Sequence, residues 1–545
     1  MTGSVSETQK DNNQRGKTNN RKCDGEPVMA QNRPNILWFC TDQQRFDTVQ
    51  ALGNSHIRTP NLDRLAAEGV AFTHAFCQSP ICTPSRASFL TGRYPANVRA
   101  CMNGNEEWGE GAPLITKLLA DKGYDCGLSG KFHLAGAHGR EEPRPHEDGY
   151  RVFHWSHDPQ DRYPSGHAYA DWLSAQGYAL RDLREDPASI PPDLHQTTWC
   201  TDRAIDFISE KRRKGPWLMS VNVFDPHAPF DPPQEYLDRY NSANVPPPLF
   251  RDSDLTTQKA IPGDFQNTAR RPEEFKAGEV IAAYYAMIEL IDENVGRLLD
   301  ALEETGQREN TVIIFSSDHG EMLGDHGLLL KGCRFYEGLV RVPLIISWPA
   351  NFPTPAETPP DAAAGDEVSP TAAENDPADD AEPPSGTETT PAPESEESEP
   401  GAGFVSEALV ELIDIAPTIL ELAGLPLPHG MQGRSLLPIL QGLADPHQHR
   451  EFVRCEYYRA LNPDAPGRDD YEGSFATMYR DRRYKVVVYH GHEQGELYDL
   501  QEDPGEFNNL WNDPASAGLR FDLVRRNFDA LAFSVDTGPP QTRPH

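Results

Sequence analysis

The feature that most constrains the fold of this 545-residue chain is an alternation of short apolar runs with amphipathic helical segments. Continuous apolar runs bounded by polar residues are typical of strands buried on both faces of a parallel sheet. The alternation predicts an α/β fold, with a mostly parallel central sheet sandwiched by helices. The predicted strands are 35–41, 124–128, 217–223 and 311–316, and the predicted helices are 59–69, 113–122, 198–214 and 279–304.

Polar side chains suited to binding or catalysis follow each of the four predicted strands. They are Asp42, Lys131, His227 and Asp318. In open α/β sheets, ligands bind outside the carboxyl ends of the strands, which meet at one edge. Residues with only structural roles would be scattered over both ends. The sequence therefore predicts an active site at this edge.

Charge and composition restrict the classes of function. The formal net charge of −34 argues against nucleic acid and anionic membranes as partners. Residues 1–33 are polar throughout and predict a disordered tail, and the acidic, proline-rich residues 352–403 predict a disordered insertion. The nine cysteines contain no C-x-x-C pair that would indicate a zinc ribbon or a redox centre.

No apolar stretch approaches the roughly 18 residues of a membrane span. The first 33 residues also lack the apolar core of a signal peptide. We therefore expect a cytoplasmic protein, with a periplasmic or secreted location left open. Oligomeric state has no signal in the sequence.

Residues 82–92 predict a short helix with a cysteine at its start. Thr83 can cap the helix, Pro84 fits its first position and Gly92 closes it. Cys82 would then lie just ahead of a helix N-terminus, which favours an anion, and Arg86 would place a cation beside the sulfur. A cysteine in such a place is most often a half-buried structural thiol.

The stretch CTPSRASFLTGRYP, residues 82–95, resembles the signature of the formylglycine-dependent sulfatases, the type I sulfatases of the alkaline phosphatase superfamily. The resemblance runs from about residue 34 to residue 513, apart from the acidic insertion. It implies a sulfuric ester hydrolase that acts on a sulfated saccharide or on a small organic or aryl sulfate. It also implies that a maturation enzyme oxidises Cys82 to formylglycine, whose hydrate is the nucleophile.

The resemblance also implies a division of the chain into domains. Residues 34–351 and 404–440 would form the catalytic α/β domain. Residues 441–545 would form a smaller C-terminal α+β subdomain, with an antiparallel sheet and a tail.

A divalent cation is implied at the ends of two strands. Its ligands would be the modified Cys82 together with Asp42, Gln43, Asp318 and His319. Oxygen donors with one imidazole suit Ca²⁺ first and Mg²⁺ second. Many sulfatases have Asp-Asp where this chain has Asp42-Gln43, and a glutamine there resembles the related phosphonate monoester and phosphodiester hydrolases.

The remaining candidates would bind sulfate or transfer protons. Lys131 and His133 resemble the G-K-x-H motif of the family, and Lys331 occupies the place of its second sulfate-binding lysine. His227 would protonate the leaving alcohol, since the pKa of imidazole lies near working pH. By spacing alone, Asn103 resembles an amide that contacts substrate oxygens.

Two alternatives to a sulfatase remain open at this point. One is a phosphonate monoester or phosphodiester hydrolase on the same fold, which Gln43 favours and Lys131 with His133 disfavour. The other is an inactive binding protein in which Cys82 is not converted. The natural substrate, the position of its sulfate and endo or exo action are not encoded in a motif.

Overall fold

The computed structural model describes residues 33–105, 108, 112–137, 141–158, 166–185, 189–212, 215–348, 403–461 and 473–538. All elements below belong to the unit that begins at Pro34. The predicted disordered tail and acidic insertion lie outside the described residues, apart from Arg33 and Gly403 at their ends.

The larger of two sheets has eight strands in the order β4-β3-β5-β1-β6-β7-β2-β8. Neighbouring strands are parallel except at β7, which runs antiparallel to both β6 and β2. The predicted α/β fold with a mostly parallel sheet is confirmed. The strands are β1 Asn35–Thr41, β2 Gly69–Phe76, β3 Asp125–Gly130, β4 Tyr150–Trp155, β5 Trp217–Asn222, β6 Thr311–Ser317, β7 Arg341–Ser347 and β8 Phe404–Glu411.

The central strand β1 shows why the predicted strands are apolar without interruption. Its side chains alternate between the two faces of the sheet. Ile36, Trp38 and Cys40 pack into the core on one face. Leu37 and Phe39 pack into the core on the other face. Because both faces are covered, no position along the strand is left for a solvated side chain.

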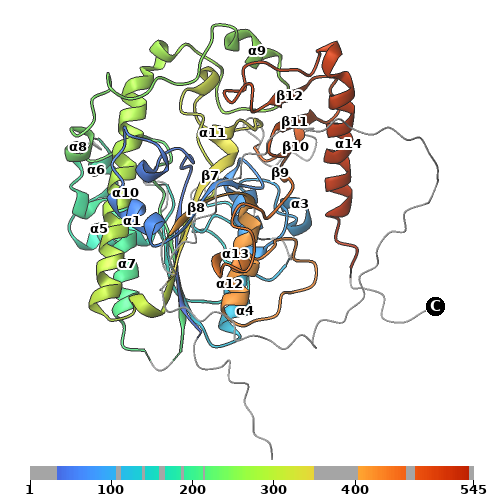
Figure 1. Cartoon of the computed structure of the whole chain (residues 1–545). Helices are drawn as coiled ribbons and strands as arrows, with labels where there is room; N and C mark the ends of the chain where they lie inside the picture. The colour runs from blue at the N-terminus through green and yellow to red at the C-terminus, as the bar shows by residue number, and fades with distance from the viewer. Residues whose placement is uncertain are drawn as a thin grey trace, which may run out of the picture. The chain divides into compact units, whose positions relative to one another are not determined.

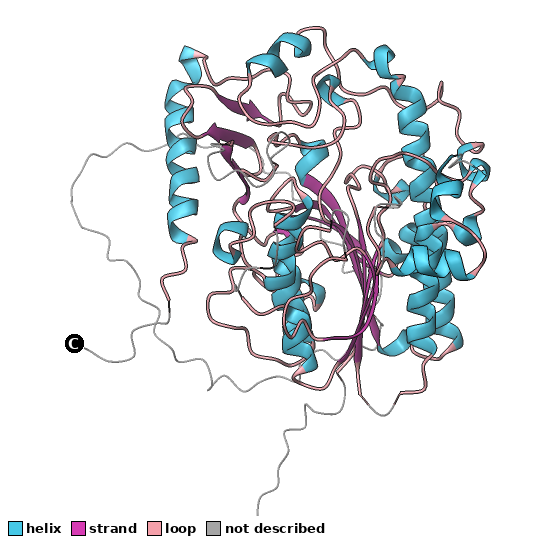
Figure 2. Cartoon of the chain, turned by 180° about the vertical axis from the view of Figure 1, so that it is seen from behind, coloured by secondary structure: helices cyan, strands magenta, loops and turns pink. Residues whose placement is uncertain are grey.

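Helices cover both faces of this sheet, and Figure 2 shows the strands nearly edge-on between them. The layer with α1, α7 and α10 lies on one side, and the layer with α4, α12 and α13 lies on the other (Figure 1). The helices are α1 Pro60–Ala67, α2 Cys82–Thr91, α3 Pro95–Val98, α4 Ile115–Ala120, α5 Ala168–Ala175, α6 Leu180–Glu185, α7 Gln196–Ser209, α8 Gln234–Leu237, α9 Asp254–Ala260, α10 Ala277–Glu304, α11 Glu337–Val340, α12 Ile415–Leu422, α13 Leu437–Leu440 and α14 Ala517–Phe533.

A second, antiparallel sheet follows in the C-terminal part of the chain. Its order is β12-β11-β10-β9, with strands β9 Val453–Tyr458, β10 Phe475–Arg480, β11 Tyr484–Tyr489 and β12 Gly495–Asp499. Helix α14 packs on it through a small apolar cluster that includes Leu523 and Val486. The expected C-terminal antiparallel sheet is therefore present.

The register of the large sheet brings the ends of several strands together. Thr41 at the end of β1 is opposite Ser317 at the end of β6, and the next residue, Asp318, donates its N–H to Thr41 O at 3.2 Å. On the other side, β5 pairs with both β1 and β3 in parallel. The strands that precede all four predicted polar residues are therefore neighbours.

None of the helices in the described ranges combines the length and the apolar character needed to cross a bilayer.

Candidate active site

Helix α2 begins two residues earlier than predicted. Ile81, with extended backbone angles, is the N-cap, and Cys82 is the first helical residue. The prediction that Thr83 caps the helix is wrong: Thr83 lies in the first turn, and its buried hydroxyl has no hydrogen-bond partner among the described residues. Asn103 Oδ1 instead accepts the N–H of Thr83 at 3.0 Å. Gly92 ends the helix as predicted, in the left-handed region at φ 67°.

The sulfur of Cys82 is surrounded by groups that favour an anion. The side chain is buried, with 1% of the residue exposed. Lys331 Nζ lies 2.8 Å from Sγ and Lys131 Nζ lies 3.6 Å from it. His319 Nε2 is at 3.1 Å. Two ammonium groups and an imidazole therefore converge on one side chain at a helix N-terminus.

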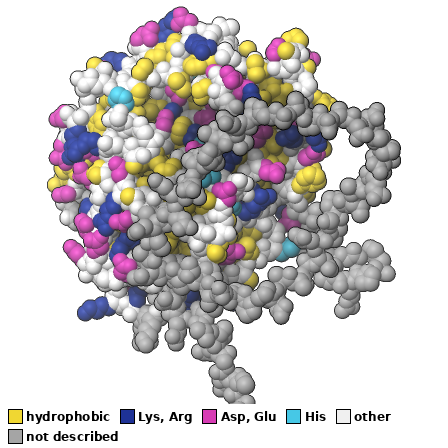
Figure 3. Space-filling model, viewed as in Figure 1, with side chains coloured by type: hydrophobic (Ala, Val, Ile, Leu, Met, Phe, Trp, Pro, Cys, Tyr) yellow, Lys and Arg dark blue, Asp and Glu magenta, His cyan; other side chains and the backbone are white. Residues whose placement is uncertain are grey.

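The two lysines near Cys82 are buried in the interior of the protein. Lys131 and Lys331 are only 1% and 2% exposed. On the face of the molecule in Figure 3, by contrast, basic and acidic side chains are interspersed. An anionic group that reaches Cys82 would thus meet a local field that the acidic chain as a whole does not provide.

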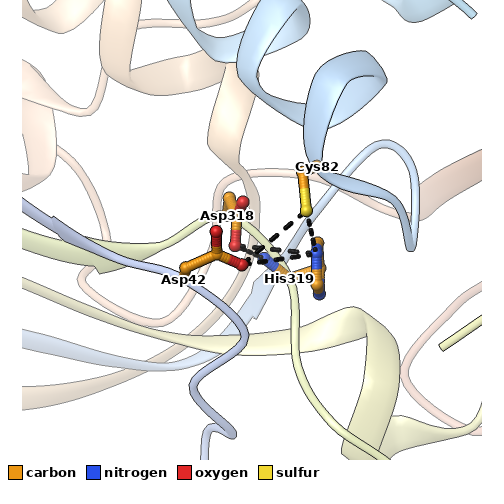
Figure 4. Close-up of side chains that lie close together, drawn as sticks. All are labelled: Asp42, Cys82, Asp318 and His319. Atoms are coloured by element: carbon orange, nitrogen blue, oxygen red, sulfur yellow. Dashed lines mark hydrogen bonds and ion pairs between the residues drawn. The ribbon is translucent and has the colours of Figure 1, made fainter. Parts of the chain in front are cut away.

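Two carboxylates, Asp42 and Asp318, lie beside His319 near the sulfur of Cys82 (Figure 4). Asp42 and Asp318 follow β1 and β6, and both are fully buried. Arg86 joins them, because its Nε donates to Asp318 Oδ2 at 2.9 Å and its Nη2 donates to Asp42 Oδ2 at 3.4 Å. Lys131 also forms an ion pair with Asp42. The predicted convergence of strand ends on Cys82 is present in the structure.

The charges around Cys82 shift its thiol toward the thiolate. Burial and the nearby Asp42 both raise the pKa of Cys82, but Lys131, Lys331 and His319 outweigh them and bring that pKa well below its usual value. The pocket is therefore built to hold negative charge at the position of the sulfur.

The two carboxylates titrate as a pair with opposite shifts. Burial raises the pKa of Asp42. The opposite effect of Lys131, His227 and Lys331 is larger and holds this pKa well below its ordinary value. Burial and the neighbouring Asp42 raise the pKa of Asp318. Buried carboxylates in contact raise each other's pKa because their charges repel. A divalent cation between them would relieve this repulsion.

The donor set fits a divalent cation. Ligand atoms of Asp42, Cys82, Asp318 and His319 all lie within 4.8 Å of one another. Gln43, the residue after Asp42, also carries a buried amide oxygen, Oε1, that has no hydrogen-bond partner among the described residues. Carboxylate and imidazole groups are common ligands of divalent cations in proteins. The group therefore could bind a metal, as the sequence predicts.

Glu321 was not singled out from the sequence, although it lies only two residues after His319. Its buried carboxylate accepts a hydrogen bond from Gln43 Nε2. It also accepts the backbone N–H groups of Leu323, at 3.0 Å, and of Leu330. The sequence carries only a weak signal for this role, because a glutamate in a polar loop is normally solvated.

Glu142 is a second buried carboxylate that accepts backbone N–H groups, in this case from the segment that follows Lys131. It accepts the N–H groups of His133 at 2.7 Å and of Ala135 at 3.0 Å. It also accepts Trp155 Nε1–H at 3.0 Å. These bonds fix a segment in which His133 has a positive φ of 57°. No spacing rule connects Glu142 to this segment.

The surroundings lower the pKa of both predicted proton-transfer histidines. Burial is the main cause that lowers the pKa of His133, and Lys131 adds to it. Burial followed by Lys331 lowers the pKa of His227 to about 3, while Asp42 opposes this shift. His227 Nδ1 lies 2.6 Å from Ala228 O, so this nitrogen carries the proton and Nε2 is free to act at the site.

The structure brings nearly all predicted site residues around Cys82. Asn103 differs from the others, because its described contact is with the backbone of α2 and not with another predicted site residue. The residues in contact with Cys82 or with one another are Asp42, Gln43, Arg86, Lys131, Asp318, His319 and Lys331, and the two further histidines are His133 and His227.

Comparison with known proteins gives the class to which this site belongs. Residues 34–425 match the family model of the sulfatases. Residues 398–530 match the model of the C-terminal region of N-sulphoglucosamine sulphohydrolase. The chain belongs to the sulfatase family, and the predicted activity of a sulfuric ester hydrolase is confirmed at this level.

Individual relatives cover almost the whole chain. The arylsulfatase of Clostridium perfringens is 28% identical over 502 residues, which span 88% of this chain and 90% of that protein. The N-acetylglucosamine-6-O-sulfatase of Bacteroides thetaiotaomicron is 25% identical over 560 residues, with 90% of this chain and 85% of that protein covered. The crystal structure of the phosphonate monoester hydrolase of Agrobacterium radiobacter superposes with a TM-score of 0.71 at 25% identity, over 94% of this chain and 100% of that one.

Proposed function

We propose that this sulfatase hydrolyses sulfate monoesters of saccharides, with formylglycine at position 82 and a divalent cation, Ca²⁺ before Mg²⁺. The observation that carries the proposal is the convergence of Lys331, Lys131 and His319 on Cys82 Sγ, at 2.8, 3.6 and 3.1 Å. A sulfate group is a compact anion with several oxygens. A pocket of two buried ammonium groups beside a cation site is complementary to it.

The cation would be held by Asp42, Gln43, Asp318, His319 and the oxidised side chain at position 82. When bound, it supplies positive charge that offsets the two carboxylates and polarises oxygens of the sulfate and of residue 82. Arg86 holds both carboxylates from the side and keeps them in position. We expect loss of the cation to weaken both substrate binding and folding stability.

Formylglycine would explain why a cysteine stands here, since its hydrate would provide one hydroxyl as a nucleophile and a second hydroxyl for the release of sulfate. A sulfur adduct on unmodified cysteine would have no second hydroxyl for that release. A formylglycine-generating maturation enzyme is therefore a required partner. The helix N-terminus and the two lysines would hold the same negative charge on oxygen that they hold on sulfur in this structure.

The chain's own residues divide the remaining work. Lys131 and Lys331 bind sulfate oxygens and stabilise the charge that develops during transfer. His227 gives a proton to the departing alcohol, and His133 takes one from residue 82. The low pKa of His227, about 3, makes its protonated form a strong acid, and the single negative charge of an arriving sulfate monoester favours that protonation. Asn103 stays a predicted substrate contact.

The saccharide class is supported by the relative from Bacteroides thetaiotaomicron, whose name specifies N-acetylglucosamine 6-O-sulfate hydrolysis. A small aryl sulfate is the practical probe, in line with the Clostridium relative. A panel of sulfated monosaccharides and disaccharides, assayed for free sulfate with matured protein, would identify the preferred position.

A second candidate function is hydrolysis of phosphonate monoesters. It is favoured by Gln43 at the ion site and by the structural similarity to the Agrobacterium enzyme. Parallel measurement of kcat/KM on an aryl sulfate and an aryl phosphonate monoester decides between the two. We expect the sulfate to be the better substrate, and a larger value on the phosphonate would overturn the proposal.

A third candidate is a binding protein with an unconverted Cys82. It predicts that protein expressed with the maturation enzyme binds sulfated sugars but releases no sulfate. Turnover by protein that carries formylglycine excludes it.

A further inference from the structure

We infer that Glu321 is the positioning residue of the cation site: it orients the Gln43 amide so that the carbonyl oxygen, and not the NH₂ group, faces the cation. This inference rests on the proposed cation site. It assigns a role to a residue that no motif marked, and it explains how a chain with glutamine in place of the second aspartate can still present an oxygen there.

Gln43 is held at every other atom that can hydrogen-bond. Its backbone N–H donates to Asp318 Oδ1 at 3.0 Å. Its carbonyl oxygen accepts Tyr284 O–H at 2.6 Å. Its side-chain NH₂ donates to Glu321. Only the side-chain oxygen Oε1 is buried without a partner among the described residues.

An amide side chain is ambiguous unless its surroundings decide which end is which. The oxygen and nitrogen of a glutamine have nearly the same shape, and only hydrogen bonding distinguishes them. A carboxylate accepts and cannot donate, so Glu321 selects the NH₂ end of Gln43. The oxygen must then lie on the opposite side of the amide, away from Glu321.

Glu321 is itself fixed in one orientation. It is fully buried, and its Oε1 accepts the N–H groups of Leu323 and Leu330. Its Oε2 is left for Gln43. The N–H of Leu330 belongs to the residue before Lys331, so the same carboxylate also anchors the segment that brings the second lysine to Cys82. Partners of this kind behind a ligand commonly change metal affinity by about 10- to 100-fold when removed.

The variant Glu321→Gln tests the inference because it keeps shape and size. Its amide oxygen can still accept the two backbone N–H groups, which leaves its NH₂ facing Gln43. Gln43 must then turn its oxygen toward residue 321 and its NH₂ toward the cation. We expect the Ca²⁺ concentration that gives half of the Ca²⁺-induced rise in thermal unfolding temperature to increase about tenfold or more.

The swap variant Gln43→Glu/Glu321→Gln provides the rescue. The NH₂ of the new glutamine would donate to the new carboxylate, and the other carboxylate oxygen would face the cation. We expect its half-saturating Ca²⁺ concentration to return to within about threefold of wild type, or below it because a charged ligand has been added. This variant restores the buried hydrogen bond, so it also serves if Glu321→Gln alone does not fold.

The matched control is Glu496→Gln in the small sheet. Glu496 is also a buried glutamate, and it accepts Tyr489 O–H at 2.7 Å and Tyr498 O–H at 2.8 Å. We expect this variant to lower the unfolding temperature without moving the half-saturating Ca²⁺ concentration.

The titration uses matured full-length protein stripped with a chelator, with Ca²⁺ alone as the probe and unfolding temperature as the readout. A wild type that responds to Ca²⁺ while Glu321→Gln responds at the same concentration overturns the inference and leaves the proposed function standing. So does a swap variant that remains tenfold weaker than wild type. A wild type that hydrolyses sulfate esters but responds to no divalent cation overturns the cation site, and the inference with it.

Discussion

Two buried lysines in different parts of the molecule show what separates a functional site from a structural one. Lys485, on β11 of the small sheet, is 0% exposed, and Lys331, beside Cys82, is 2% exposed. Lys485 Nζ lies 2.7 Å from carboxylate oxygens of both Glu337 and Glu506, and 2.9 Å from Phe335 O. The described partners of Lys331 Nζ are Cys82 Sγ at 2.8 Å and His319 Nε2 at 3.2 Å.

The two lysines are equally buried and differ in how much opposite charge surrounds each ammonium group. A charge taken out of water is costly unless opposite charge and hydrogen bonds replace the solvent. For Lys485, the carboxylates of Glu337 and Glu506 and a backbone carbonyl take the place of water, so this lysine stabilises the fold. Lys331 has the sulfur of Cys82 and an imidazole as its described contacts, and the sulfur stands at the position of the proposed reacting group. Its positive charge therefore faces the place that an incoming anion would occupy.

The largest loss of activity is expected when the side chain of residue 82, which Lys331 contacts, is removed. Cys82→Ala takes away the precursor of the nucleophile, and we expect kcat/KM for aryl sulfate to fall by about 10⁴-fold or more. The unfolding temperature should change little, since only the end of one buried side chain is lost. Sulfate release and thermal unfolding are measured on the same preparation, and retained activity would contradict the assignment of Cys82.

Lys331→Met is expected to lower kcat/KM by about 10²- to 10³-fold, because one buried cation that stabilises transferring sulfate is lost. Stability should stay the same or rise, since methionine fills a similar volume without an uncompensated charge. The surface variant Lys276→Met is the control and should change neither quantity. A marked loss of stability in Lys331→Met would place this lysine in the same class as Lys485.

Lys485→Met should have the reverse effect. It leaves Glu337 and Glu506 buried without their ammonium partner, which costs about 3–5 kcal/mol of unfolding free energy. The folded enzyme should keep kcat/KM within about twofold of wild type. Urea unfolding and initial rates test the two halves of this prediction, and a loss of rate without a loss of stability would break the comparison.

A smaller effect, on the pH dependence of stability, is expected from His74. It lies near Arg341 and Arg480, which pair with Glu337, the partner of Lys485. Burial first, then Arg341 and Arg480, lower the pKa of His74 to about 3 from its ordinary value of 6.5. The folded protein therefore binds fewer protons than the unfolded chain between these values, and stability is lost as pH falls from about 6.5 toward 3. The contribution is at most about 1.4 kcal/mol per pH unit.

His74→Gln removes this contribution. We expect the difference in unfolding free energy between wild type and His74→Gln to be flat above about pH 7 and to shift against wild type at lower pH. Urea unfolding at several pH values between 7.5 and 5 measures it. A pH-independent difference would show that the pKa of His74 is not lowered in the folded protein, by burial or by Arg341 and Arg480.

Much of the large sheet could be predicted because each strand carries its own signal. The apolar run of β1 is continuous since Leu37 and Trp38 face opposite cores, and this leaves a pattern in the local sequence. The strand ends then predicted that Asp42 and Asp318 would meet, because parallel neighbours end at one edge. Family resemblance added the roles of Lys131 and Lys331, which spacing alone could not supply.

The residues that escaped prediction act through contacts between segments far apart in the chain. Asn103 caps α2 from outside the helix, so the local rule that favoured Thr83 failed. Glu321 and Glu142 each accept backbone N–H groups of loops that have no regular periodicity. Their sequence neighbourhoods look like ordinary polar loops, and only the tertiary structure shows that these carboxylates are buried.

The most direct test of the account is the mass of the peptide that contains residue 82, taken from a preparation that hydrolyses aryl sulfate. The account predicts a lighter peptide that reacts with an aldehyde probe, because an aldehyde oxygen replaces the sulfur of Cys82 and hydrogen is lost. An active preparation whose peptide carries only unmodified cysteine would contradict it.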